Sequence, residues 1–75
     1  MSFSKWQGIS PALREVMERV CTPRQIDCLC LKAQGLGNRR IGLMLGGIDE
    51  STVRHHLYRG AHAIKQEVAA MRGHQ

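Results

Sequence analysis

The fold is decided by NRRIGLMLGGIDESTVRHHLYR, residues 38–59 of a chain of 75. Apolar residues recur at helical spacing on either side of Gly46 and Gly47, and glycines commonly end a helix and open a turn. The pattern predicts one helix over about residues 38–45 and another over about residues 50–70. The stretch is therefore expected to form two helices that meet at a tight glycine turn.

Local signals support both of these helices. Asn38 is a candidate N-cap for the first helix, and Asp49, Glu50 or Ser51 can cap the second. Gly42 lies inside the first helix, where the missing side chain lets another helix approach at a cost of about 1 kcal/mol relative to alanine. The second helix is expected to bury a single apolar stripe, formed by Val53, Leu57, Gly60, Ala61, Ile64 and Val68.

Two further helices are expected upstream of this stretch. Ser10 followed by Pro11, and Thr22 followed by Pro23, each combine an N-cap residue with a proline at the first helical position. The second of these helices is expected to run to about Gln34. Because almost no residues separate the two helices, the first must fold back over the second.

The predicted fold is all-α, a four-helix helix-turn-helix domain over residues 10–71. It is preceded by an N-terminal arm, residues 1–9, and followed by a tail, residues 72–75. In the arm, Phe3 and Trp6 are expected to cover the small core, with partner docking as the alternative. A chain this short buries only about 60 to 65% of its unfolded surface, so it leaves little room for an enclosed catalytic pocket.

The charge balance points to a polyanionic partner. The chain holds 11 lysines and arginines against 6 acidic residues, and its net charge is +5. Such a balance suits nucleic acid, although many small basic proteins do not bind it. No apolar run approaches the roughly 18 residues that span a bilayer, and the first residues lack the apolar segment of a signal peptide. We therefore expect a cytoplasmic, nucleoid-associated protein with no membrane partner.

The sequence gives no support for an enzyme, a metal site or a cofactor. The three cysteines, Cys21, Cys28 and Cys30, are an odd number and are expected to stay reduced. On a helix, Cys28 and Cys30 point about 200° apart, so buried apolar thiols are a better interpretation than a shared metal ion. His55 and His56 have no partner that would act as a base or a nucleophile, and a catalytic role is rejected.

The side of the second helix that lies opposite the apolar stripe is polar and basic. A solvated face is the simplest account of such a stripe, but the preceding glycine turn and short helix favour contact with DNA. Arginine suits guanine, and a threonine methyl packs on thymine. The predicted base-reading residues are Ser51, Thr52, Arg54, His55, Tyr58 and Arg59.

Positive charge also gathers where the first of the two helices begins. Arg39 and Arg40 lie there, and two guanidinium groups at the positive end of a helix dipole can hold a DNA phosphate. Solubility is the alternative reason for two adjacent arginines. Lys65 and Arg72 lie farther along the chain, where they can contact a flanking phosphate or none, and we assign Lys65 to the phosphate set.

The run TPRQIDCLCLKAQGLGNRRIGLMLGGIDESTVRHHL, residues 22–57, resembles the GerE/LuxR-type helix-turn-helix. That family shows Thr-Pro-Arg-Glu, an apolar helix, Ala-x-Gly, a bracing helix that ends in Leu-Gly, and Ser-Thr-Val-Lys. The layout is equally similar to region four of bacterial sigma factors, which binds the minus-35 promoter element. Either resemblance implies promoter-type DNA binding in bacteria or their phages. The matching residues are Thr22, Pro23, Arg24, Leu29, Ala33, Gly35, Asn38, Ile41, Leu45, Gly46, Ser51, Thr52, Val53, Arg54 and His56.

The chain departs from the family pattern at several positions. Gly47 adds one residue to the turn, which can re-aim the second helix, and Gly42 replaces the usual alanine. Leu43 and Met44 occupy positions that are normally charged, so they form a candidate surface for a protein partner. The extra helix through which GerE-type proteins dimerise is missing after Ile64. A homodimer would therefore have to use the first helix or the end of the last one.

The expected function is that of a stand-alone, sequence-specific transcriptional regulator that reads promoter-type double-stranded DNA through the major groove. The alternative is a protein-interaction module that mimics sigma region four and docks on RNA polymerase or another regulator. Leu43 and Met44 motivate this alternative, because one exposed leucine means little but a methionine beside it makes a partner surface reasonable. An enzyme is not expected, because no paired carboxylates, metal-spaced ligands or phosphate-cradling loop occur.

Overall fold

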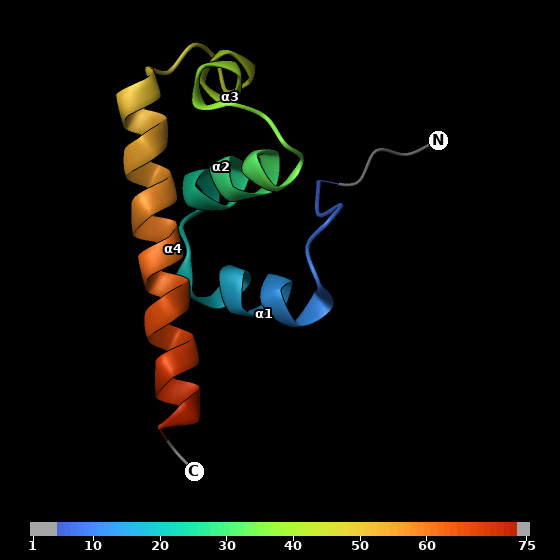
Figure 1. Ribbon diagram of the computed structural model, residues 1–75, viewed down its shortest axis with the longest axis vertical. Helices are drawn as coiled ribbons and strands as arrows, with labels where there is room; N and C mark the ends of the chain where they lie inside the picture. The colour runs from blue at the N-terminus through green and yellow to red at the C-terminus, as the bar shows by residue number, and fades with distance from the viewer. Residues whose placement is uncertain (1–4, 74–75) are drawn as a thin grey trace.

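The computed structural model describes residues 5–73, which form four α-helices. The longest, α4, runs along one side of the molecule, and α3, α2 and α1 pack against it in that order from its N-terminal end (Figure 1). No β-strand occurs within the described residues, so the predicted all-α class is confirmed. In the same range, no helix has the length and apolar character needed to cross a membrane. The helices are α1 (Pro11–Val20), α2 (Pro23–Ala33), α3 (Asn38–Met44) and α4 (Glu50–Arg72).

The first two helices begin where the sequence predicts, because each start is capped. The backbone N–H of Leu13 donates to the Ser10 hydroxyl at 3.2 Å. At the start of α2, the N–H of Gln25 donates to the Thr22 hydroxyl at 3.2 Å. The N–H of Thr22 in turn donates to the Gln25 side-chain oxygen at 3.0 Å, which completes a capping box. α2 ends at Ala33, as expected.

The start of α3 differs from the prediction by one residue. Gly37 is the N-cap and makes no side-chain hydrogen bond, while Asn38 is already helical. The Asn38 side chain is engaged elsewhere, because its oxygen accepts a hydrogen bond from Lys32 Nζ at 3.0 Å. α4 begins after the predicted cap Asp49 and continues to Arg72, two residues past the expected end at Ala70.

Two apolar clusters hold the helices together. Met17 of α1 packs with Ile26 and Cys30 of α2, so α1 does fold back onto α2. The other cluster joins α2, α3 and α4 through Cys28, Ile41 and Val53. Because Cys28 and Cys30 belong to different clusters, the predicted opposite directions of these buried thiols are confirmed. The predicted packing of Trp6 on the core is also confirmed, whereas Phe3 lies outside the described residues.

The apolar stripe of α4 is buried over only part of its predicted length. Val53 and Gly60 are buried, but Ala61 and Val68 are exposed, so the predicted stripe is wrong at these two positions. Ala61 lies about 80° around the helix from Val53, at the edge of the stripe. Val68 lies beside a groove that α1 leaves open. The C-terminal part of α4 is therefore less covered than its sequence suggests.

Gly60 sets the distance between α2 and α4. A Cβ atom built there would lie 2.9 Å from Leu29 Cδ1 and 3.3 Å from the Gln25 Cβ. Contacts this short are tighter than ordinary van der Waals packing, so the absence of a side chain at Gly60 lets the two helices approach. α4 is thereby seated on α2, and its first half projects past α2 toward α3 (Figure 1).

Candidate nucleic-acid interface

The turn between α3 and α4 is built on two consecutive glycines in the left-handed region. Gly46 has φ 92° and Gly47 has φ 87°, values that L side chains rarely adopt. This conformation lets the N–H groups of Gly47 and Ile48 both donate to the Gly42 carbonyl, at 2.9 and 3.0 Å. Gly47 therefore takes part in closing the C-terminal end of α3.

Gly42 permits this compact turn. A Cβ atom at Gly42 would overlap the Ile48 carbonyl oxygen and would lie 3.6 Å from Val53 Cγ2. The nearest neighbour is thus the backbone of the turn, and α4 also approaches Gly42 through Val53. The reason is that Gly46 and Gly47 curl the chain back over the end of α3 before α4 begins.

Two carboxylates stand at the start of α4. Asp49 is the N-cap but makes no capping hydrogen bond with its side chain, and Glu50 is the first helical residue. The Asp49 carboxylate instead accepts a hydrogen bond from the Ser51 hydroxyl at 3.1 Å. Negative groups here are stabilised by the helix dipole. Carboxylates repel anions and accept hydrogen bonds, and the sequence interpretation had considered these two residues only as helix caps.

The predicted base-reading residues all lie on the exposed side of the first half of α4. Buried Val53 points the other way, into the core. Tyr58 is 70% exposed, and its ring stacks on that of His62 with centroids 6.2 Å apart and planes 9° apart. The exposed residues of this face are Ser51, Thr52, Arg54, His55, Tyr58 and Arg59.

Four arginines of α3 and α4 keep their charge unneutralised by any described residue. Arg39, Arg40, Arg54 and Arg59 are exposed, and none of them forms an ion pair within residues 5–73. The carboxylates that do pair serve other cations, in the bridges Lys5 to Asp27, Arg14 to Glu18 and Arg19 to Glu67.

Lys32 adds a cation beside α3 that the sequence interpretation missed. The hydrogen bond from Lys32 to the Asn38 side chain brings the ammonium group to the start of α3. Asn38 directly precedes Arg39 and Arg40 in the chain. The place of Lys32 in the last turn of α2, just before a short connection, was the available signal. Because α3 has only seven residues, these charges and not the helix dipole dominate this region.

Lys65 is not brought together with the other predicted phosphate ligands. It lies about 16 Å along the α4 axis from Arg54, and α3 packs at the opposite, N-terminal end of α4 (Figure 1). Its neighbours in a shallow hollow are Val68, Ala69 and Arg72. Any contact of Lys65 with DNA would be separate from the cluster at α3.

Leu43 and Met44 form an exposed apolar pair on α3, as predicted. Their side chains are 67% and 59% exposed. Met44 also lines a groove of about 260 Å³ with Leu45 and with Leu31 of α2. This surface is distinct from the polar face of α4.

Comparison with models of protein families, with curated protein sequences and with solved structures finds no match to this chain. Resemblance to the GerE/LuxR type and to sigma region four therefore stays a prediction. The absence of a metal also stays a prediction. Within residues 5–73, no three His, Cys, Asp or Glu side chains are grouped so that they could hold a metal ion.

Proposed function

We propose that this protein is a helix-turn-helix transcriptional regulator that binds double-stranded DNA sequence-specifically, with the first half of α4 in the major groove. The observation that carries the proposal is the set of exposed, unpaired arginines on α3 and α4. A helix fits the major groove, and unneutralised guanidinium groups bind phosphates and guanine edges. Such a regulator would act on the nucleoid, in the cytoplasm of a bacterium.

The two helices have different roles in this proposal. Arg39, Arg40 and Lys32 hold phosphates and so fix the register of the protein on the duplex. Arg54 and Arg59 read guanine through paired donors. Lys65, far along α4, contacts at most a flanking phosphate.

The rest of the α4 face supplies neutral and apolar contacts to the bases. The Thr52 methyl packs on thymine. Ser51, His55 and Tyr58 offer hydrogen-bonding groups, and all three are exposed. Because the Ser51 hydroxyl proton is already given to Asp49, Ser51 acts toward DNA as an acceptor.

The turn determines how α4 meets the groove. Hydrogen bonds from Gly47 and Ile48 to Gly42 fix the end of α3, and buried Val53 fixes the start of α4. The path between these fixed points leaves little freedom in the angle between the helices. The turn with Gly47 therefore supports one defined angle between α3 and α4 when α4 docks in the groove.

The decisive experiment is selection of bound duplexes from a random pool, followed by affinity measurements on the selected duplex across a salt series. Three or four phosphate contacts give a slope of log affinity against log salt of about −3 to −4. A scrambled duplex of the same length is the control and should bind more weakly. No enrichment from the pool, together with a flat salt dependence, would overturn the proposal.

A second candidate function rests on the exposed pair Leu43 and Met44 and on the groove beside it. A surface of this kind suits a protein partner, here RNA polymerase or another regulator. Pull-down with purified polymerase tests this function, and it compares the unchanged chain with Leu43→Ser, which should lose the contact. Capture that the variant abolishes, combined with undetectable duplex binding, would favour this function over DNA reading.

A further inference from the structure

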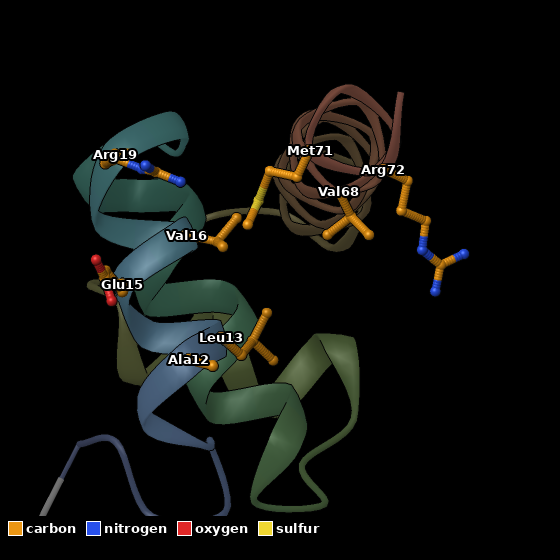
Figure 2. A pocket seen from close by; sticks show the side chains of 8 residues that line it. All are labelled: Ala12, Leu13, Glu15, Val16, Arg19, Val68, Met71 and Arg72. Carbon is orange, nitrogen blue, oxygen red and sulfur yellow. The ribbon is translucent and has the colours of Figure 1, made fainter. Parts of the chain in front are cut away.

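An apolar groove of about 620 Å³ separates α1 from the C-terminal end of α4 (Figure 2). Leu13 and Val16 line it from α1, and Val68 and Met71 line it from α4. Val68 is 36% exposed and Met71 is 54% exposed, and Figure 2 shows the Met71 side chain directed toward α1. The groove is thus an open apolar surface that no described part of the chain covers.

The two walls of the groove are tied together by an ion pair. Arg19 Nη2 of α1 lies 2.9 Å from Glu67 Oε2 of α4, and both charges are thereby satisfied. Arg19 is itself one of the residues that line the groove. Because this bridge joins the walls, the groove is part of the folded structure and can accept a partner without being opened.

Opposite charges stand on the two rims of the groove. Glu15 lies on the α1 rim and Arg72 on the α4 rim, and Figure 2 shows them on opposite sides, both directed away from the groove. Both are exposed, and neither forms an ion pair with a described residue. A surface with one unpaired charge of each sign on facing rims is complementary to itself.

We infer that the groove is the interface of a homodimer, occupied by the same face of a second copy of this chain. A two-fold axis along the groove places the α1 rim of each copy against the α4 rim of the other. Glu15 of each copy then faces Arg72 of its partner, so the rim contact forms twice. The apolar side chains of Val68 and Met71 are covered at the centre.

The inference does not depend on DNA binding. Met71 lies about 20 Å along α4 from Tyr58, so a dimer formed at the groove leaves α3, the turn and the first half of α4 free. A chain that dimerises without binding any duplex would keep this inference and overturn the proposed function. A monomer that still binds a duplex would do the reverse.

The test is sedimentation equilibrium of the whole chain over a concentration series. We expect a reversible dimer, and Met71→Lys should raise its dissociation constant at least about tenfold, because burial of the methionine is lost in both copies. Met44→Lys is the matched control, since Met44 is 59% exposed but lies on α3. A monomer at every concentration, or a dimer that Met44→Lys dissociates and Met71→Lys does not, would overturn the inference.

Charge reversal provides a second test that does not depend on the apolar residues. Glu15→Arg alone places two positive groups together at each rim, and Arg72→Glu alone places two negative groups together. Each single variant should dimerise more weakly, whereas the double variant recreates both pairs and should recover the original dissociation constant. Circular dichroism should show unchanged helix content in all three. A double variant that is no tighter than either single one would contradict the two-fold arrangement.

Discussion

Single arginines of α3 and α4 differ in what they are expected to contribute to DNA binding. Arg54→Ala should relax sequence preference by about 1 to 3 kcal/mol at one base pair, because it removes paired donors to a guanine. Arg59→Ala should relax preference at a neighbouring pair. Arg39→Ala should weaken every duplex alike and reduce the salt slope by about one. Affinities for the selected duplex and for single-base variants of it measure these effects.

Arg14 provides the matched control for these arginine variants. It is exposed like the others, but it lies on α1 and pairs with Glu18. Arg14→Ala should leave both affinity and preference unchanged. If Arg39, Arg54 and Arg59 variants lost the same affinity on every duplex, the division between reading and positioning residues would be wrong.

Gly42 shows how strongly one missing side chain is required. Alanine would improve helix propensity by about 1 kcal/mol, but its Cβ would overlap the Ile48 carbonyl oxygen. Backbone cannot move aside cheaply, so overpacking should prevail, and we expect Gly42→Ala to lower the free energy of unfolding by about 1 to 3 kcal/mol. Urea denaturation measures it. Gly37→Ser is the control: its site is open and its φ is −76°, so it should not destabilise the fold.

The buried thiols make stability depend on alkaline pH. Burial raises the pKa of Cys28 above its ordinary value, and it does the same for Cys21 and Cys30. The folded chain therefore holds these protons more tightly than the unfolded chain. The protonated thiols contribute fully to the free energy of unfolding below the thiol pKa of the unfolded chain, about 8.5. This contribution is lost as the pH rises through the thiol pKa of the folded chain. The urea midpoint of the unchanged chain should fall across this pH range, and the midpoint of Cys28→Ala should fall less. Equal declines in the two proteins would contradict a contribution of the buried Cys28 thiol.

At the scale of the helical element, the ends of the helices carry much of the local stability. The capping box of Thr22 and Gln25 satisfies two backbone groups at the start of α2, which contributes to both core clusters. Thr22→Ala should therefore lower the free energy of unfolding by about 1 kcal/mol. Ser51→Ala is the control, because its hydroxyl bonds to exposed Asp49 and caps no helix. Thermal or urea unfolding distinguishes the two, and equal losses would show that the capping box has no special weight.

The whole molecule combines a polar face at one end of α4 with an apolar groove at the other. If both proposals hold, the dimer carries two reading helices related by a two-fold axis, and the selected duplex should have matching two-fold symmetry. Half-sites about 10 base pairs apart fit two helices that enter successive major grooves on one side of the duplex. Met71→Lys should then reduce binding to the full duplex more than to an isolated half-site. Selection of single, asymmetric sites would exclude a dimeric mode of reading.

Local signals in the sequence were enough to determine the helices and much of the exposed face. Hydroxyl caps followed by proline set the starts of α1 and α2, and Gly46 with Gly47 set the end of α3. Helical periodicity was enough to place Cys28 and Cys30 in separate parts of the core and to leave Leu43 exposed. These features depend on residues within a turn or two of each other, so a sequence pattern is able to carry them.

Features that depend on how one element turns or packs against another were decided by the tertiary structure. The Ile48 carbonyl meets Gly42 because the turn curls back, and Lys32 reaches Asn38 because α2 and α3 lie close together. The pairing of Arg19 in α1 with Glu67 in α4 joins two residues that lie 48 positions apart in the chain. The groove exists because α1 stops short of covering the last turns of α4. Distance between helices is set by the side chains of both partners at once, and no pattern along a single helix records it.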